Sequence, residues 1–558
     1  MKKNLLSIML SITLAFAFSC KDYMSVNPDG YIPADKSFKN ADDAISSVYG
    51  LYAMMQPLVD QIYLAGEAQG DLVVSARGAD NWISEIAQNR VTPENPYTDY
   101  TNFYKLIVAC NNVTKGLGNI LRTDPVNYPL AKYTFNLAEI TCIRAWTYLQ
   151  LVKIWGDVPY ISTDITSVDQ ITAVAPEKRD VILGRILKDV KDNYTVMQAS
   201  WIRGTYDSRA VFSSSGSKFL LSEIYLESGD LPNAWQTIIP TLPFGERDAQ
   251  TRGEISFSAT PPYWPQRVFQ FSGNEWAFFI DFDGSKGQKN SLQYWTNNKN
   301  GGIYALKPSR NAVNNWSIPY SVLVNYQTTV ERGLYFDPPI ITIGAFAGYY
   351  TSMIEDSEGN FIPGFKGDSL RGAGYSYNID GGDTLIFKYL FKERFVSRSI
   401  LLGDANSNDD ADFCVYRAGP FAILTYEMIN NMGMPWEALQ YMNGGFAGQQ
   451  FYGTRMRALL MPFRMDPNEA DPVRQVNRYI LEEAALEGAF EGTRWFNLVR
   501  FSRRPGYESW LGEYVSQKYP PNQREAIKAR LSNPAYWYFP YYYKNTVTNK
   551  LLHQKPGY

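Results

Sequence analysis

The first third of the chain has the periodicity of amphipathic helices. This feature limits the folds that the chain can adopt more strongly than any other. Apolar residues recur at intervals of three and four from Ala41 to Met55, and helical patterning extends over longer spans from Tyr97 to Leu121 and from Leu130 to Trp155. Such spacing is typical of helices that bury one face. Gly156-Asp157-Val158-Pro159 ends the third span, and another helix is expected from Pro176 to Met197.

A more specific pattern follows between Ser217 and Leu242, where four residues fall at the spacing of a tetratricopeptide helix–turn–helix: Leu221, Tyr225, Gly229 and Ala234. The glycine ends the first helix, and the small alanine lets the second helix pack closely against it. Gly433 and Ala438 repeat part of this spacing late in the chain. These patterns predict a mainly α fold class, with a scaffold built from tetratricopeptide-like helix pairs.

The character of the sequence changes between about 243 and 412, where Gly, Asn, Ser, Pro and aromatic residues dominate and turn clusters stand at 297–302 and 381–382. A long irregular stretch in a folded protein is normally functional or disordered, and the many aromatic residues favour an ordered one. We expect a large loop-rich irregular insertion at about 243–412 on a helical scaffold. The scaffold spans about 41–242 and 413–502, including helices at Pro420–Tyr441 and Pro472–Phe501, and a C-terminal tail spans 503–558.

Composition excludes several function classes. The 558 residues hold 53 basic and 56 acidic side chains, a net charge of −3, so nucleic acid is not an expected partner. The single histidine, His553, lies in the C-terminal tail, which makes His-ligated zinc and His-dependent nucleophilic catalysis improbable. Phosphate-binding and dinucleotide-binding glycine motifs are missing from the sequence. We predict no cofactor.

Residues 1–19 are predicted to be a lipoprotein signal peptide. Lys2 and Lys3 precede a largely apolar stretch of 14 residues, Leu5 to Phe18, which is too short to span a bilayer as a helix. The cleavage site stands directly before Cys20, the expected lipidation site, so the lipid would be the only link to the membrane. The alternative is an ordinary secretory signal with an incidental cysteine.

Cysteines and acidic loops predict neither a disulfide framework nor a metal site. Beyond Cys20 the chain has Cys110, Cys142 and Cys414, an odd number that we interpret as small buried residues. Oxygen-rich runs that begin at Asp281 and Asp404 suit calcium by residue type, but neither has the glycine and glutamate positions of an EF-hand.

Three segments, in order along the chain, resemble the SusD-like/RagB family of outer-membrane nutrient-binding lipoproteins. The first is a helix with the pattern E-x4-R-A-x-x-Y that closes on G-D-V-P, formed here by Glu139, Arg144-Ala145, Tyr148 and Gly156–Pro159. The second is Glu487, Phe490-Glu491-Gly492, Arg494-Trp495 and Leu498-Val499-Arg500. The third is the closing run Asn549–Tyr558. The resemblance extends from Cys20 nearly to the end, as one SusD-like domain at 20–558.

The resemblance implies a mainly α fold, a superhelix of tetratricopeptide-like helix pairs that carries the irregular insertion. It also implies a lipid-anchored protein in the outer membrane, facing the cell surface. Such a protein binds a nutrient and delivers it to a SusC-like TonB-dependent barrel. The aromatic content of 15% favours a glycan or oligosaccharide as cargo, with an oligopeptide as the alternative. The resemblance implies a binding protein that is not an enzyme.

A surface glycoside hydrolase is a third alternative, because Glu487 and Glu491 are spaced to share a helix face, with Arg494 beside them. The preferred interpretation is structural: an arginine beside buried acids usually holds neighbouring elements together.

The family's binding residues lie on an early loop and on the insertion. By that analogy the early loop, from Gly70 to Asn89, and the insertion together supply nine candidate ligand-binding residues: Arg77, Asp80, Asn81, Trp82, Asn290, Gln293, Tyr294, Trp295 and Trp316. Aromatic planes beside amides and a cation suit stacking with directional hydrogen bonds. The alternative for each tryptophan is a place in the local core.

Overall fold

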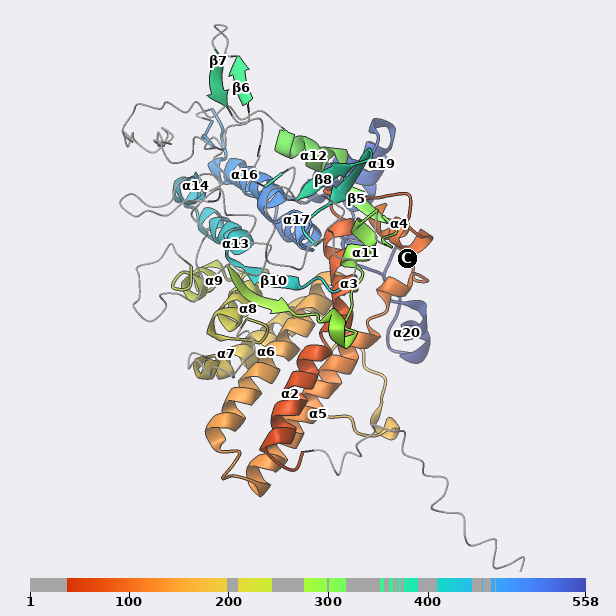
Figure 1. The fold of residues 1–558 in the computed structure, drawn as a ribbon, viewed down its shortest axis with the longest axis vertical. Coiled ribbons are helices and arrows are strands. Elements are labelled where there is room, and N and C mark those ends of the chain that lie inside the picture. The colour runs from red at the N-terminus through yellow and green to blue at the C-terminus, as the bar shows by residue number, and fades with distance from the viewer. Residues whose placement is uncertain are drawn as a thin grey trace, which may run out of the picture.

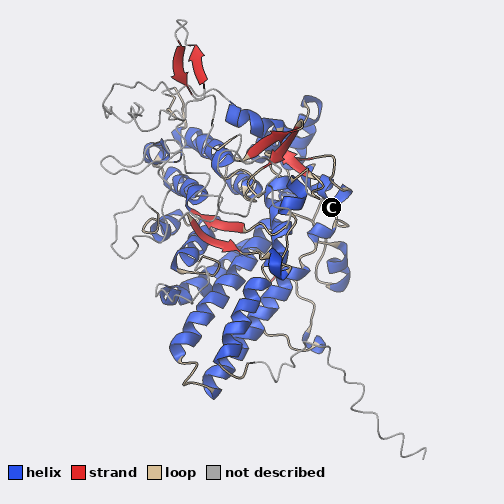
Figure 2. Cartoon of the chain, in the orientation of Figure 1, coloured by secondary structure: helices blue, strands red, loops and turns tan. Residues whose placement is uncertain are grey.

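A computed structural model describes residues 38–197, 209–242, 275–298, 301–317, 352–355, 361–364, 368, 371–372, 376–389, 409–443, 454, 463–466 and 468–558. The predicted signal peptide 1–19, Cys20 and the acidic run at 404–408 lie outside these residues. Helices make up most of the described chain (Figure 2), which confirms the predicted fold class.

Long helices form the N-terminal part, drawn from red to yellow in Figure 1. Their bounds are α2 Ala41–Ala53, α3 Val59–Tyr63, α4 Asn81–Ala87, α5 Thr101–Thr123, α6 Leu130–Trp155, α7 Arg179–Met197, α8 Ser214–Glu227 and α9 Leu231–Ile238. Helix α6 has the predicted bounds, because Pro129 precedes its first turn and Gly156 takes a φ of 71° at its end. It packs between α5 and α7.

The tetratricopeptide-like pairs are confirmed at both predicted places. Gly229, with a φ of 82°, ends α8, and Ala234 of α9 is fully buried against it. The later pair repeats this arrangement: α13 (Ala418–Asn431) and α14 (Pro435–Asn443) meet through Gly433 and buried Ala438. Helix α9 also contacts α13, so the two pairs stack.

One antiparallel ribbon brackets the described part of the predicted insertion. Its first described strand, β4 (Trp276–Ile280), pairs with β10 (Phe413–Arg417) at its end, and this ribbon packs on α8 and α13. Between them lie α11 Leu292–Thr296, β5 Leu306–Pro308, α12 Arg310–Ser317, β6 Ser352–Glu355, β7 Phe361–Gly364, β8 Tyr377–Asp380 and β9 Asp383–Ile386. Each sheet of the described residues has two strands, with pairs β1 (Val73–Ser75) to β5, β2 (Val158–Pro159) to β3 (Pro176–Glu177), β6 to β7 and β8 to β9.

The C-terminal part consists of α16 Pro472–Glu487, α17 Arg494–Ser502, α18 Trp510–Val515, α19 Pro521–Leu531 and α20 Tyr543–Thr548. The single helix expected over Pro472–Phe501 is wrong. It breaks after Glu487, because Phe490 and Gly492 take φ values of 65° and 78° and turn the chain sharply.

The left-handed backbone at the α8–α9 turn gives a test of the helix-pair architecture. Replacing Gly229 by alanine should lower the free energy of unfolding by about 1–2 kcal/mol, because a Cβ disfavours positive φ. A Cβ at this position would meet no atom within 4 Å, so the loss would be purely conformational.

Gly184 is the matched control, because it lies within α7 with equally open space around it. Gly184→Ala should raise the free energy of unfolding by about 0.5–1 kcal/mol. Urea denaturation of both variants measures the difference, and equal effects would contradict the assigned turn.

Candidate ligand-binding surface

Backbone hydrogen bonds join the two segments in which the sequence predicts ligand contacts. Segment 76–78 donates two N–H groups to carbonyls of segment 303–305, at 2.7 and 3.0 Å. Segment 303–305 in turn donates two N–H groups to carbonyls of α11, at 2.9 and 2.7 Å. The early loop and the insertion therefore meet at one place, beside the β1–β5 pair, as Figure 1 shows for α4, α11 and β5.

Gly78 makes this close approach possible. A Cβ at residue 78 would lie 1.6 Å from the carbonyl oxygen of Ile303, a distance that no side chain allows. Any larger residue must push the early loop away from the insertion, so Gly78 fixes the spacing between them.

Arg77 lies on this surface with a partner from the insertion. Its Nη1 donates to Oδ1 of Asp383 at 2.5 Å, and its guanidinium lies 4.8 Å from the ring centroid of Tyr304. Because of the hydrogen bond with Arg77, the pKa of Asp383 is lowered from its usual value. The sequence did not predict Asp383 or Tyr304, although the Gly381-Gly382 turn between β8 and β9 was visible.

The next three predicted residues begin α4. Asp80 caps the helix, since its carboxylate accepts the N–H of Ile83 at 2.7 Å. Asn81 is exposed, and Trp82 keeps 36% of its surface exposed while its carbonyl accepts the side-chain amide of Asn95. Asp80 therefore has a structural role as the helix cap, and Trp82 has a side chain that is partly accessible to a ligand.

In α11 and just before it, the predicted residues divide between surface and core. Asn290 and Gln293 are buried, where the first donates to the carbonyl of Ala411 and the second accepts the N–H of Asp410. Trp295 is 3% exposed and its ring packs edge-on against Tyr97, whereas Tyr294 is 38% exposed.

Trp316 belongs to the core, at 2% exposure in α12. Its ring centroid lies 5.4 Å from Tyr377 and 5.6 Å from Phe490. For Trp295 and Trp316, the alternative of a core position describes the structure. The exposed candidates are Arg77, Asp80, Asn81, Trp82 and Tyr294. Because Asp80 caps α4, we call the other four the candidate ligand surface; ligand binding there stays a prediction.

A cluster of buried charges joins the insertion to the helical scaffold. Arg417 pairs with Glu487 at 2.8 Å and with Glu491 at 2.7 Å, and Lys388 reaches Glu491 at 2.5 Å. Arg371 bonds Glu487 at 3.0 Å. Burial alone would raise the pKa of Glu491, but the cations Arg417 and Lys388 hold it below its usual value. We call these five residues the central ion cluster.

The central ion cluster corrects one prediction and confirms another. Glu487, Glu491 and Arg494 do not share a helix face, because Glu491 lies in the turn between α16 and α17. The structural interpretation of the acids is confirmed, since both carboxylates are occupied by cations from other elements. Two carboxylates so neutralised are unsuited to the acid/base pair of a hydrolase.

The turn after α16 is held by a second buried carboxylate system. Glu67, in the π-helical segment η2 (Leu64–Ala68), accepts the N–H groups of Phe490 and Gly492 at 2.7 and 3.0 Å. Burial raises the pKa of Glu67 to about 7 despite these bonds. Arg494 donates two hydrogen bonds, of 2.6 and 2.9 Å, to the carboxylate of Asp71. These contacts fix the start of the early loop to α17.

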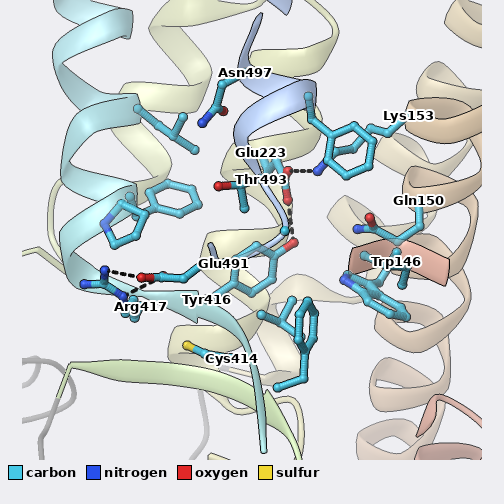
Figure 3. Close-up of a pocket in the computed structure, with 18 residues that line it drawn as sticks. Trp146, Gln150, Lys153, Glu223, Cys414, Tyr416, Arg417, Glu491, Thr493 and Asn497 are labelled. Carbon is cyan, nitrogen blue, oxygen red and sulfur yellow. Dashed lines mark hydrogen bonds and ion pairs between the residues drawn. The ribbon is translucent and has the colours of Figure 1, made fainter. Parts of the chain in front are cut away.

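An interior cavity of about 70 Å³ lies beside the central ion cluster (Figure 3). Tyr416 and Lys153 both bond Glu223 at 2.7 Å on one side of it, and Arg417 pairs with Glu491 on another. No predicted ligand residue lines it. Its volume holds about two waters and lies far below the roughly 300 Å³ of a small-molecule site, so we assign it to the interior.

Cysteines and acids in the described segments form no recognisable metal centre. Cys110, Cys142 and Cys414 are free, and no group of three or more His, Cys, Asp or Glu side chains there is placed to hold a metal ion. Asp283 instead accepts hydrogen bonds from Ser285 and pairs with Lys286.

Comparison with known proteins gives a consistent family match. The model of the SusD family matches residues 393–558. SusD-like protein P38 of Formosa agariphila is 21% identical over 525 residues, which cover 90% of this chain and 92% of the relative. The C-terminal third of the chain thus matches the SusD family, and the chain is similar to a SusD-like protein over most of its length.

Solved SusD-like structures share the fold of this chain. A SusD superfamily protein from Bacteroides thetaiotaomicron VPI-5482 superposes with a TM-score of 0.64 at 15% identity, covering 93% of this chain and 99% of that one. A laminarin-binding SusD-like protein gives a TM-score of 0.58 at 16% identity, covering 93% and 100%. Among the helices that the structure describes, none has the length and apolarity needed to cross a membrane.

The central ion cluster predicts a large cost for removing its shared cation. Arg417→Met should lower the free energy of unfolding by about 3–5 kcal/mol, because Glu487 and Glu491 would lose a partner while remaining buried. Arg185→Met is the control, since Arg185 pairs with Glu177 at 2.9 Å on the surface with half of its side chain exposed. That change should cost less than about 1 kcal/mol.

Denaturant unfolding of the two variants measures both effects. A loss for Arg417→Met as small as that for Arg185→Met would show that the cluster does not hold the fold together.

Proposed function

We propose that this protein binds a glycan on the candidate ligand surface and does not act on it chemically. The observation that carries the proposal is that two exposed aromatic residues, Trp82 and Tyr294, lie in or next to segments from distant parts of the chain that backbone hydrogen bonds hold together. Sugar rings present apolar C–H faces that suit such aromatic planes, and Asn81 and Arg77 add donors for hydroxyl groups.

The match to the SusD family supports a binding role, and the laminarin-binding structural neighbour supports a saccharide as cargo. An oligopeptide is the second candidate, because aromatic and amide side chains also serve peptide recognition. A hydrolase is disfavoured by the central ion cluster, in which the two acids of the family motif are already paired.

Replacing the exposed rings should weaken binding without altering the fold. Trp82→Ala and Tyr294→Ala should each cost about 1–3 kcal/mol of binding free energy, by analogy with base–aromatic stacking. Trp436→Ala is the control, because Trp436 is 44% exposed on α14, away from the candidate ligand surface.

Calorimetric titration with a panel of oligosaccharides measures the effect, with the melting temperature as the check on folding. If Trp82→Ala and Tyr294→Ala bind like the Trp436→Ala control, the ligand site lies elsewhere.

The same proposal includes a lipid anchor at Cys20 on the outer face of the outer membrane. The supporting observation is the short, largely apolar stretch of 14 residues that ends before Cys20. Cys20→Ala should move the protein from the membrane fraction to the soluble or secreted pool, since one acylated residue is its expected link to the bilayer. Immunoblots of fractionated cells test this, and unchanged fractionation would refute the anchor.

We further propose that the cargo passes to a SusC-like TonB-dependent barrel. The match to the SusD family supports this proposal. A stable complex of this kind should bury more than about 2,000 Å². Pull-down from membranes in mild detergent should therefore recover a TonB-dependent barrel with the protein. Recovery of the protein alone, under conditions that preserve other outer-membrane complexes, would count against the partnership.

A further inference from the structure

We propose that the candidate ligand surface selects uncharged glycans and that Asp383 is the residue that sets this selectivity. The inference rests on the proposed function, glycan binding at this surface, and adds the class of glycan. Asp383 acts through Arg77, as a positioning and neutralising residue that need not touch the ligand.

The cation that the surface offers to a ligand is already engaged. The Arg77 side chain is 64% exposed, and its Nη1 is bound to Asp383, whose side chain is 19% exposed. The other oxygen of Asp383 accepts the amide of Asn298 at 2.9 Å. Both carboxylate oxygens therefore have partners, and the carboxylate stays beside the guanidinium.

The aromatic ring that stacks against Arg77, that of Tyr304, is also held in place. Tyr304, 4% exposed, lies under the guanidinium and donates its hydroxyl hydrogen to the carbonyl of Thr384 at 2.9 Å. This bond ties segment 303–305 to β9, the strand that begins at Asp383. The guanidinium is thus held in place by stacking as well as by charge.

Two further charges of the described residues lie near the Arg77–Asp383 pair. Lys307 acts with Arg77 to lower the pKa of Asp383, and Asp80 places a negative charge at the start of α4. The guanidinium of Arg77 is already neutralised by Asp383. A carboxylate or sulfate on a ligand would therefore gain little from Arg77 and would be repelled by the like charge of Asp383. A neutral sugar meets no such repulsion and can still use the remaining N–H donors of Arg77.

Removing the charge of Asp383 should reverse the preference. Asp383→Asn keeps the side-chain size and leaves Arg77 stacked on Tyr304, with donors free for a planar carboxylate or a sulfate. The variant should therefore bind anionic oligosaccharides more tightly than the wild type does, while its affinity for neutral ones changes little.

The matched control is Asp164→Asn. Asp164 pairs with Lys115 at 2.6 Å, with side-chain exposures of 27% and 63% that resemble those of Asp383 and Arg77. It follows the β2 segment and pairs with α5, outside the candidate ligand surface. The control removes the same charge at another surface position.

The experiment titrates wild type, Asp383→Asn and Asp164→Asn with three probes: a neutral β-glucan oligosaccharide, a polyuronate oligosaccharide and a sulfated galactan oligosaccharide. Wild type should bind the neutral probe best, with an affinity that changes less than about twofold between roughly 50 and 500 mM NaCl. Asp383→Asn should bind an anionic probe about fivefold more tightly than wild type at the lower salt, and the gain should vanish at the higher salt. Asp164→Asn should match wild type.

Each other outcome overturns a definite part of the account. Tighter binding of an anionic probe than of the neutral probe by wild type, or an unchanged preference in Asp383→Asn, refutes the inference and leaves glycan binding intact. If neither the three probes nor a wider panel of neutral, uronate and sulfated oligosaccharides binds wild type, both the inference and the proposed glycan function fall.

Discussion

The buried carboxylates of Glu487 and Glu491 are the constraint on which the rest of the structure depends. Cations from two parts of the chain neutralise them: Arg417 from the scaffold strand β10, and Arg371 and Lys388 from the insertion. A buried charge without a partner costs several kcal/mol, so the insertion and the scaffold are most stable in an arrangement that satisfies all of these pairs. The described part of the predicted insertion thereby gains a defined position, although its described strands form only two-stranded sheets.

That constraint extends toward the surface through short links. The turn that carries Glu491 also donates two backbone N–H groups to Glu67, and Arg494 just after it holds Asp71. Strand β1 follows Asp71 directly, pairs with β5, and leads into Gly78 and Trp82. The aromatic residues of the candidate ligand surface are thus positioned by bonds that begin in the core, which is how a loop can present side chains with little freedom.

Local sequence signals predicted the helices well and the surface only in part. Helix α6 and the alanines of the two helix pairs follow from periodicity and glycine positions, which depend on near neighbours in the chain. The break after Glu487 was missed because it depends on a left-handed Phe490, which distant Glu67 stabilises. Trp295 was placed at the surface because its neighbours are polar. Two of the polar residues before it, Asn290 and Gln293, are themselves buried and hydrogen-bonded to backbone groups. The sequence alone does not reveal these hydrogen-bond partners.

Amide hydrogen exchange with and without ligand tests most directly the claim that cargo binds where the early loop meets the insertion. Our account predicts that a neutral oligosaccharide slows exchange in residues 76–83, 294–298 and 301–305, while the segments around the interior cavity at Glu223 and Tyr416 keep their exchange rates. Protection confined to the cavity segments or to the helix pairs, with those three segments unchanged, would contradict it.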